Sequence, residues 1–242
     1  MNTLTITAAA ALALAAGGAA AQTDVVRLGT EGAYPPYNFI NDSGEVDGLE
    51  RDLGDELCDR AQLNCTWVTN DWDTIIPNLV SGNYDTIIAG MSITPERDDV
   101  IDFTQAYIPP APSSYLAPAG MEVDAESGVI TAQAGTIQAD HVAESGATLI
   151  EFATPEETVA AVRNGEADAV LSDKAYVEPI AAEDPALELV RDVSIGGGIG
   201  MGLRESDAEL RATFDEAIAS MKADGTLNEM LIEWFGEDAL TW

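Results

Sequence analysis

The sequence has few basic residues. Ten lysines and arginines stand against 43 aspartates and glutamates, so the chain of 242 residues has a formal net charge of −33 at pH 7. Binding to nucleic acid and to anionic membrane surfaces depends on clusters of positive charge. The composition therefore argues against both kinds of partner and favours the approach of small cations. We interpret most of this charge as an adaptation to a saline environment, where a solvated acidic surface maintains solubility.

Long apolar runs are also missing after the first residues, so no transmembrane helix is expected. The chain begins MNTLTITAAAALALAAGGAAAQ, in which an apolar run leads to Ala19, Ala20 and Ala21 before Gln22. Small residues at this place are typical of a signal-peptide cleavage site, although no lysine or arginine precedes the run. We interpret residues 1–21 as a secretory signal, which predicts a periplasmic protein.

Histidine and cysteine are scarce, since His141, Cys58 and Cys65 are the only three in the chain. A metal site requires more ligands than these, so neither a metal nor another cofactor is expected. No nucleophile–base pair or phosphate-binding loop is visible, which argues against an enzyme. Two cysteines seven positions apart favour a local disulfide in an exported protein, with two free buried thiols as the alternative.

Short apolar segments alternate with amphipathic ones, a pattern that predicts an α/β fold with mainly parallel sheets. The strands are expected at residues 24–30, 65–69, 84–88, 128–132, 148–152 and 167–171. The helices are expected at residues 49–63, 74–80, 136–144, 154–164, 173–182, 206–222 and 226–235. Their predicted N-caps include Asp73, Ser206 and Thr154, the last in a capping box with Glu157.

Two segments do not fit this alternation. Residues 31–39 contain glycine and two prolines, so we expect a loop there. Residues 195–204, IGGGIGMGLR, are rich in glycine but do not match the G-x-G-x-x-G spacing of a dinucleotide-binding loop, and we interpret them as a pliable strand between two halves of the protein.

The composition changes around Pro109, Pro110 and Pro112, where a second series of strands and helices begins. We therefore expect one lobe made of residues 22–111 and 200–242 and a second lobe made of residues 112–199. In open parallel sheets, ligands bind beyond the carboxyl ends of the strands. The loops expected there carry Glu31, Tyr34, Trp72, Gly90 and Arg97.

The segment AGMSITPER, residues 89–97, is a candidate ligand-binding loop. It places a glycine and two hydroxyl residues, Ser92 and Thr94, just before Arg97. The planar fork of an arginine is suited to a carboxylate. Arg97 is therefore a candidate carboxylate clamp, and the alternative is an ion pair with Asp98, Asp99 or Asp102 on a solvated turn.

Seven segments in a fixed order carry a resemblance to a known family: GTEGAYPPYNF, LGDELCDRAQLNCTW, DWDTIIPNL, AGMSITPER, GEADAVLSD, GMGLRESDAELRATFDEAI and DGTLNEM. Together they resemble the periplasmic polar amino-acid-binding proteins of ABC transporters, and most of all the lysine/arginine/ornithine- and histidine-binding members. The resemblance implies a two-lobe type II fold with two crossover strands. It also implies a monomer that delivers an amino acid to a permease in the inner membrane.

The resemblance also implies roles for individual residues. Tyr34 and Trp72 would sandwich the ligand side chain, although core packing is the usual role of such aromatics. Arg97, with Ser92 and the backbone of Thr136, would hold the α-carboxylate. The α-amino group would be held by Asp173, for which a helix N-cap is the alternative, and by the carbonyl of Gly90. The full predicted set is Glu31, Tyr34, Trp72, Gly90, Met91, Ser92, Arg97, Gln133, Thr136, Gln138 and Asp173.

The ligand side chain is expected to be positively charged, because Glu31 stands where the basic-residue binders commonly have an aspartate. Two departures from the family weaken this expectation. Ala89 replaces a common serine, and Gln133 occupies a position that is often apolar. Glutamine or another neutral polar amino acid is therefore one alternative. A periplasmic dehydratase of the prephenate or arogenate type on the same fold is another.

Overall fold

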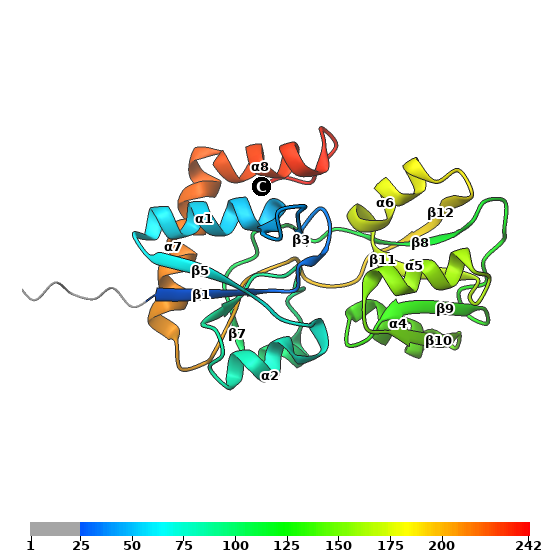
Figure 1. Ribbon diagram of the computed structural model, residues 1–242, viewed down its shortest axis with the longest axis horizontal. Helices are drawn as coiled ribbons and strands as arrows, with labels where there is room; N and C mark the ends of the chain where they lie inside the picture. Colours follow the sequence, from blue (N-terminus) through cyan, green and yellow to red (C-terminus); the bar gives the residue numbers. More distant parts are fainter. Residues whose placement is uncertain (1–24) are drawn as a thin grey trace, which may run out of the picture.

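The computed structural model describes residues 25–242, and the expected signal segment at residues 1–21 lies outside them. Two groups of elements lie side by side along the longest axis of the molecule (Figure 1). Each group is built around its own five-stranded sheet. The helices between residues 25 and 242 fall short of the length and apolarity that a bilayer crossing requires.

The first sheet has the strand order β5-β1-β6-β13-β7. Strand β1 runs parallel to both β5 and β6, whereas β13 is antiparallel to β6 and β7. Leu28 in β1 and Ile87 in β6 are fully buried, as expected for central strands covered on both faces. These strands comprise Asn64–Thr69 (β5), Val25–Thr30 (β1), Thr86–Ile87 (β6), Gly202–Leu203 (β13) and Asp102–Phe103 (β7).

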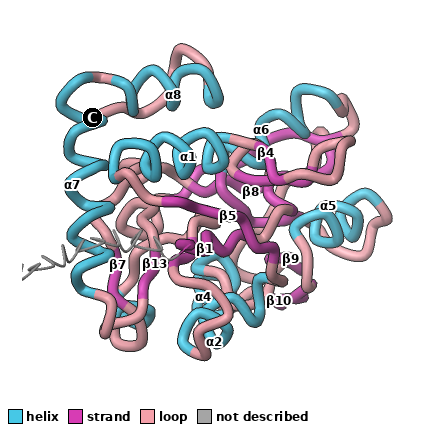
Figure 2. Tube along the Cα trace, turned by 60° about the vertical axis from the view of Figure 1, so that its left-hand side comes forward, coloured by secondary structure: helices cyan, strands magenta, loops and turns pink. Residues whose placement is uncertain are grey.

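Helices cover both faces of the first sheet (Figure 2). Leu53 of α1 and Phe214 of α7 belong to one hydrophobic cluster, together with Leu231 of α8. Leu79 of α2 packs in a second cluster with Tyr84. The helices are α1 (Leu49–Ala61), α2 (Ile75–Val80), α7 (Ala208–Asp224) and α8 (Thr226–Phe235), and a small antiparallel sheet of β2 (Ala33–Tyr34), β3 (Asn38–Ile40) and β4 (Val46–Asp47) precedes α1.

The second sheet has the strand order β10-β9-β11-β8-β12. Val142 of α4 packs with Ile130 and Leu171 on one face, whereas α5 and α6 pack on the other face through Val162 and Val177. The strands are β8 (Ser113–Pro118), β9 (Val129–Gln133), β10 (Thr148–Phe152), β11 (Ala169–Asp173) and β12 (Leu187–Val193), and the helices are α4 (Ile137–Ser145), α5 (Pro155–Arg163) and α6 (Lys174–Glu183).

Two segments connect the sheets, one between β7 and β8 and the other between β12 and β13 (Figure 1). They meet in an isolated antiparallel bridge between Ile108 and Ile199. The predicted two-lobe α/β fold with two crossover segments is confirmed. The residue bounds 22–111, 112–199 and 200–242 stay a prediction.

Three predictions about strands were wrong. Strands β8 and β12 were not predicted, because both are antiparallel members of the second sheet and lie outside the strand–helix alternation. The expected loop at residues 31–39 contains β2 and the start of β3. Between residues 195 and 204 only Gly202–Leu203 forms a ladder, because the backbone bends at Gly196 and Gly198, which have positive φ, and Ile199 forms only isolated bridges.

Two of the predicted N-caps were also wrong. Trp72–Thr74 forms a short 3-10 helix before α2, so Asp73 lies inside a turn and does not cap the helix. Asp207, and not Ser206 as predicted, is the residue directly before α7. The Ser206 hydroxyl donates to the Asp207 carboxylate instead. The capping box of Thr154 and Glu157 at the start of α5 is confirmed.

The predicted disulfide between Cys58 and Cys65 is confirmed, and its Cα atoms lie 6.3 Å apart. It joins the last turns of α1 to the start of β5. Because the closed loop is short, we expect the Cys58→Ser, Cys65→Ser double variant to lose at most about 3 kcal/mol of unfolding free energy, measured by urea denaturation. Intact mass after alkylation without reductant is the control. Two thiols that alkylate readily in the native protein would contradict the bond.

Candidate functional site

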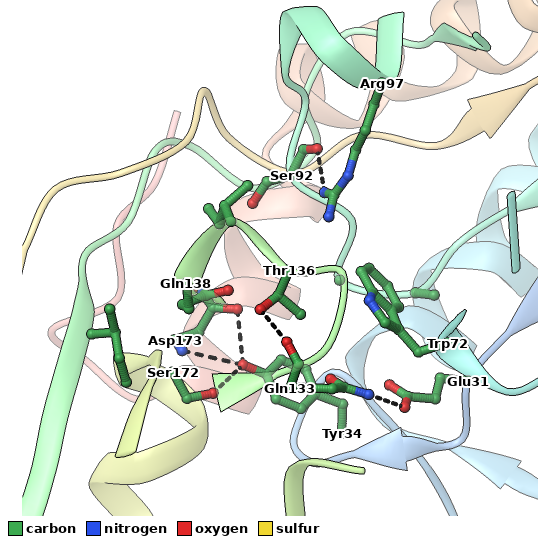
Figure 3. Close-up of a pocket in the computed structure, with 14 residues that line it drawn as sticks. Glu31, Tyr34, Trp72, Ser92, Arg97, Gln133, Thr136, Gln138, Ser172 and Asp173 are labelled. Atoms are coloured by element: carbon green, nitrogen blue, oxygen red, sulfur yellow. Dashed lines mark hydrogen bonds between the residues drawn. The ribbon is translucent and has the colours of Figure 1, made fainter. Parts of the chain in front are cut away.

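A pocket lies between the two lobes, beyond the carboxyl ends of β1, β6, β9 and β11 (Figure 3). It holds about 410 Å³ of space outside the protein atoms, part of it open to solvent. This position agrees with the general rule for ligand sites in open parallel sheets. The lining residues are Glu31, Tyr34, Trp72, Ala89, Gly90, Ser92, Arg97, Gln133, Thr136, Ile137, Gln138, Leu171, Ser172 and Asp173.

All residues of the predicted set except Met91 line this pocket. Met91 is fully buried in the hydrophobic cluster around α2 and β6. The backbone bends at Gly90, which has a positive φ, so that Gly90 and Ser92 line the pocket while the side chain of Met91 packs in the core. Ser172 lines the pocket but was not predicted, although its place next to Asp173 at the end of β11 was a usable signal.

Arg97 supplies the positive charge of the pocket from the short helix α3 (Pro95–Asp98). Its Nη1 donates to the carbonyl of Ser92 at 2.8 Å, and its Nη2 donates to the carbonyl of Gly135 in the other lobe at 3.2 Å. Burial lowers the pKa of this guanidinium. In the described part of the chain, Arg97 forms no ion pair with the neighbouring aspartates, and the alternative role on a solvated turn is not seen.

The amino end of α4 lies beside Arg97. Thr136 caps this helix: its Oγ1 accepts from the N–H of Ala139 at 3.2 Å and donates to the carbonyl of Gln133 at 2.7 Å. The first N–H groups of a helix carry a partial positive charge and have no partner within the helix. An anionic group in this part of the pocket would therefore meet Arg97 and the end of a helix dipole.

Asp173 places a carboxylate at the end of β11. It accepts from the Tyr34 hydroxyl at 2.9 Å and from Nε2 of Gln138 at 2.9 Å (Figure 3). Burial raises the pKa of Asp173 to about 6, against the opposing effects of these hydrogen bonds and of Arg97. Asp173 occupies the N-cap position of α6, as the alternative had it, but its side chain accepts from no N–H of that helix. A cation in contact would stabilise the ionised form.

Glu31 supplies a second carboxylate, from the loop after β1. Its Oε1 accepts from Nε2 of Gln133 at 2.6 Å across the two lobes, and the same nitrogen donates to the carbonyl of Ala153 at 3.1 Å. Burial, with smaller contributions from the charges of Asp71 and Glu50, raises the pKa of Glu31 to about 7 against the opposing effect of the Gln133 hydrogen bond. Within residues 25–242 no basic side chain pairs with Glu31. This carboxylate is thus suited to a cationic group of a ligand.

The two pocket aromatics have partners within the protein. Tyr34 is only 8% exposed and its ring stacks on Tyr37 and Tyr176, with centroid distances of 5.3 Å and 4.6 Å. Trp72 lies under the guanidinium of Arg97, with the Arg97 Cζ 5.4 Å from the ring centroid. These contacts leave little free surface on the Tyr34 ring, whereas Trp72 is only half-buried. The aromatic sandwich around a ligand stays a prediction.

Comparison with known proteins finds a matching family and several relatives. The family model described as bacterial extracellular solute-binding proteins, family 3, matches residues 26–237. The lysine/arginine/ornithine-binding periplasmic protein of Escherichia coli strain K12 is 32% identical over 93% of this chain and 92% of its own. The octopine-binding periplasmic protein of Rhizobium meliloti is also 32% identical, over 95% and 96%.

A solved structure agrees over nearly the same length. The periplasmic His/Glu/Gln/Arg/opine family-binding protein from Silicibacter pomeroyi, in complex with lysine, is 70% identical, with a TM-score of 0.87 over 90% of this chain and all of the other. These relatives are named as binding proteins, so the alternative of a dehydratase is not favoured. The chain belongs to the bacterial extracellular solute-binding proteins of family 3.

Proposed function

We propose that the protein captures an L-amino acid with a basic side chain between its lobes and delivers it to the permease of an ABC transporter. The supporting observation is the charge pattern of the pocket, which holds one half-buried cation, Arg97, and two separate carboxylates, Glu31 and Asp173. A basic amino acid has the complementary pattern, with one carboxylate and two cationic groups. Groups of opposite charge in a buried site satisfy each other.

We place the ligand in the following orientation. Its α-carboxylate lies at Arg97, Ser92 and the amino end of α4. Its α-ammonium lies at Asp173 and the carbonyl of Gly90, and its side-chain cation reaches Glu31. The relatives named for lysine, arginine and ornithine support this class of ligand, and so does the lysine complex of the 70% identical protein.

Ligand binding would close the two lobes. The pocket takes residues from both, and Gly135 of the second lobe already accepts hydrogen bonds from Arg97 and Trp72 of the first. Only contacts that differ between the open and closed forms favour closure. The lobes, made of residues 22–111 with 200–242 and of residues 112–199, would close by bending of the crossover segments. The mature chain, after removal of residues 1–21, would act in the periplasm as a monomer.

The direct test is isothermal titration calorimetry with purified protein and lysine, ornithine, arginine, histidine, glutamine, citrulline and octopine. The proposal expects the tightest binding from the ligands with a cationic side chain. Glutamine is the competing candidate, because the Gln133 amide beside Glu31 offers a neutral polar partner. Tight binding of glutamine without binding of any basic amino acid would overturn the basic-ligand proposal.

Glu31→Gln is expected to weaken lysine binding by about 1–3 kcal/mol, because one charge-assisted hydrogen bond to the ligand is lost. Glutamine binding should change little, since a neutral side chain gains nothing from the charge. Calorimetry with both ligands measures the difference. The matched control is Glu45→Gln, an exposed glutamate outside the pocket. Equal losses for lysine and glutamine would show that Glu31 does not recognise a cation.

A further inference from the structure

Glu50 is a fully buried glutamate that does not line the pocket. It is the second residue of α1, and its carboxylate is bound by three donors. Asn38 Nδ2 donates to Oε2 at 2.7 Å, the N–H of Gly90 donates to Oε1 at 2.6 Å, and the hydroxyl of Tyr107 also donates to Oε1. Burial raises the pKa of Glu50, while the three hydrogen bonds and the nearby helix amino end favour the ionised form.

These contacts lead to the backbone of two pocket loops. Gly90 lines the pocket in a left-handed conformation, with φ of 62°, and its N–H is held directly by Glu50. On the other side, Asn38 Oδ1 accepts from the N–H of Gly32 at 2.7 Å, and Gly32 follows Glu31. A continuous chain of hydrogen bonds therefore runs from Gly90 through Glu50 and Asn38 to Gly32.

The donors and acceptors in this chain of hydrogen bonds can be arranged in only one way. The backbone N–H groups at both ends donate, so Asn38 must turn its carbonyl oxygen to Gly32 and its NH₂ group to Glu50. Glu50 must then accept at both of its oxygens, which a carboxylate does and an amide does not. A glutamine at this position would set two donors against each other at Asn38 or at Gly90. Rotation of the Asn38 amide would only move that conflict to Gly32.

We propose that Glu50 is a positioning residue for ligand binding, which fixes the loops of Glu31 and Gly90 through this directional chain. A buried donor left without an acceptor costs more than the hydrogen bond itself contributes. The loop that bears it shifts to find another partner, and the ligand contacts shift with it. The use of lysine as ligand in the test rests on the proposed function.

The test compares Glu50→Gln, Asn38→Asp and the double variant by calorimetry with lysine. Glu50→Gln should weaken lysine binding about tenfold or more, because one donor stays unpaired. Asn38→Asp should also weaken it, since two carboxylates then face each other in a buried site. In the double variant the new amide donates to the new carboxylate, which still accepts from Gly32. Its affinity should return to within about threefold of the wild type.

A second measurement separates positioning from general stability. Leu57→Ala, at a fully buried position of the same helix that does not line the pocket, should lower the melting temperature without changing the affinity for lysine. Amide exchange at Gly32 and Gly90 should speed up in Glu50→Gln beyond the change in Leu57→Ala, and should recover in the double variant.

The proposal is overturned if Glu50→Gln keeps wild-type affinity and exchange, or if the double variant neither binds nor folds better than Glu50→Gln. If Glu50→Gln fails to fold but the double variant folds, the result supports the directional chain of hydrogen bonds. If the wild type binds no basic amino acid, the proposed function fails, and the exchange rates of Gly32 and Gly90 still decide the role of Glu50.

Discussion

Arg97→Ala is expected to weaken lysine binding by about 2–5 kcal/mol while the protein still folds. The substitution leaves the α-carboxylate of the ligand in a buried site without its cation, and a buried unpaired charge is among the most costly defects in a complex. Folding survives because the bonds of Arg97 are to the carbonyls of Ser92 and Gly135, and no buried acid depends on it for an ion pair in the described structure. Calorimetry measures the affinity for lysine, and thermal denaturation measures the stability of the protein.

Arg191 provides a matched control for this substitution. It lies over the ring of Tyr115 at 5.1 Å, as Arg97 lies over Trp72, but it does not line the pocket between the lobes. Arg191→Ala should leave lysine binding unchanged. Arg97→Lys keeps the charge but loses the fork, so its affinity should fall between those of the wild type and Arg97→Ala. If Arg97→Ala binds lysine within about threefold of the wild type, the pocket has been assigned the wrong role.

Much of the fold follows from local patterns in the sequence. The apolar spacing after Gly48 predicts a helix at 49–63, and α1 runs over Leu49–Ala61. The short strand–helix alternation likewise predicts the parallel core of both sheets. Strand β8 could not be predicted in this way, because its residues are buried without alternation and its partners β11 and β12 are antiparallel to it. Its strand character depends on neighbours 54 or more residues away in the sequence, the separation of Leu116 from Val170.

In the candidate site, too, some features could be predicted from the sequence and others could not. The positions of Glu31, Gly90 and Asp173 follow from the rule that parallel strands point their carboxyl ends to the ligand. The partners of these residues do not follow from it. Gln133 is 102 residues from Glu31 and Ser172 is 138 residues from Tyr34, so these contacts exist only once the two lobes meet. The stack of Tyr34 on Tyr176 has the same origin, and it could not be predicted from either segment alone.

Asp173→Ala is the second substitution with a large expected effect, a loss of about 2–5 kcal/mol in lysine affinity. The α-ammonium of the ligand loses its anionic partner in the second lobe, and only the carbonyl of Gly90 remains. Burial raises the pKa of Asp173 to about 6 in the closed pocket, which is still below pH 7.5, and the ammonium group of the ligand favours the ionised carboxylate further. Calorimetry at pH 7.5 tests the loss, with Asp192→Ala as the control, because Asp192 pairs with Lys174 outside the pocket.

A modified ligand decides whether Asp173 acts on the α-ammonium. Nα-acetyl-lysine keeps the carboxylate and the side-chain cation but lacks the charge that Asp173 would meet. The wild type should therefore bind it far more weakly than lysine, and Asp173→Ala should add little to that loss. Two changes that remove the same interaction are strongly non-additive, whereas changes to independent contacts add. Additive losses would place the α-ammonium elsewhere in the pocket and reverse the proposed orientation of the ligand, with its side chain toward Asp173 and its amino group toward Glu31.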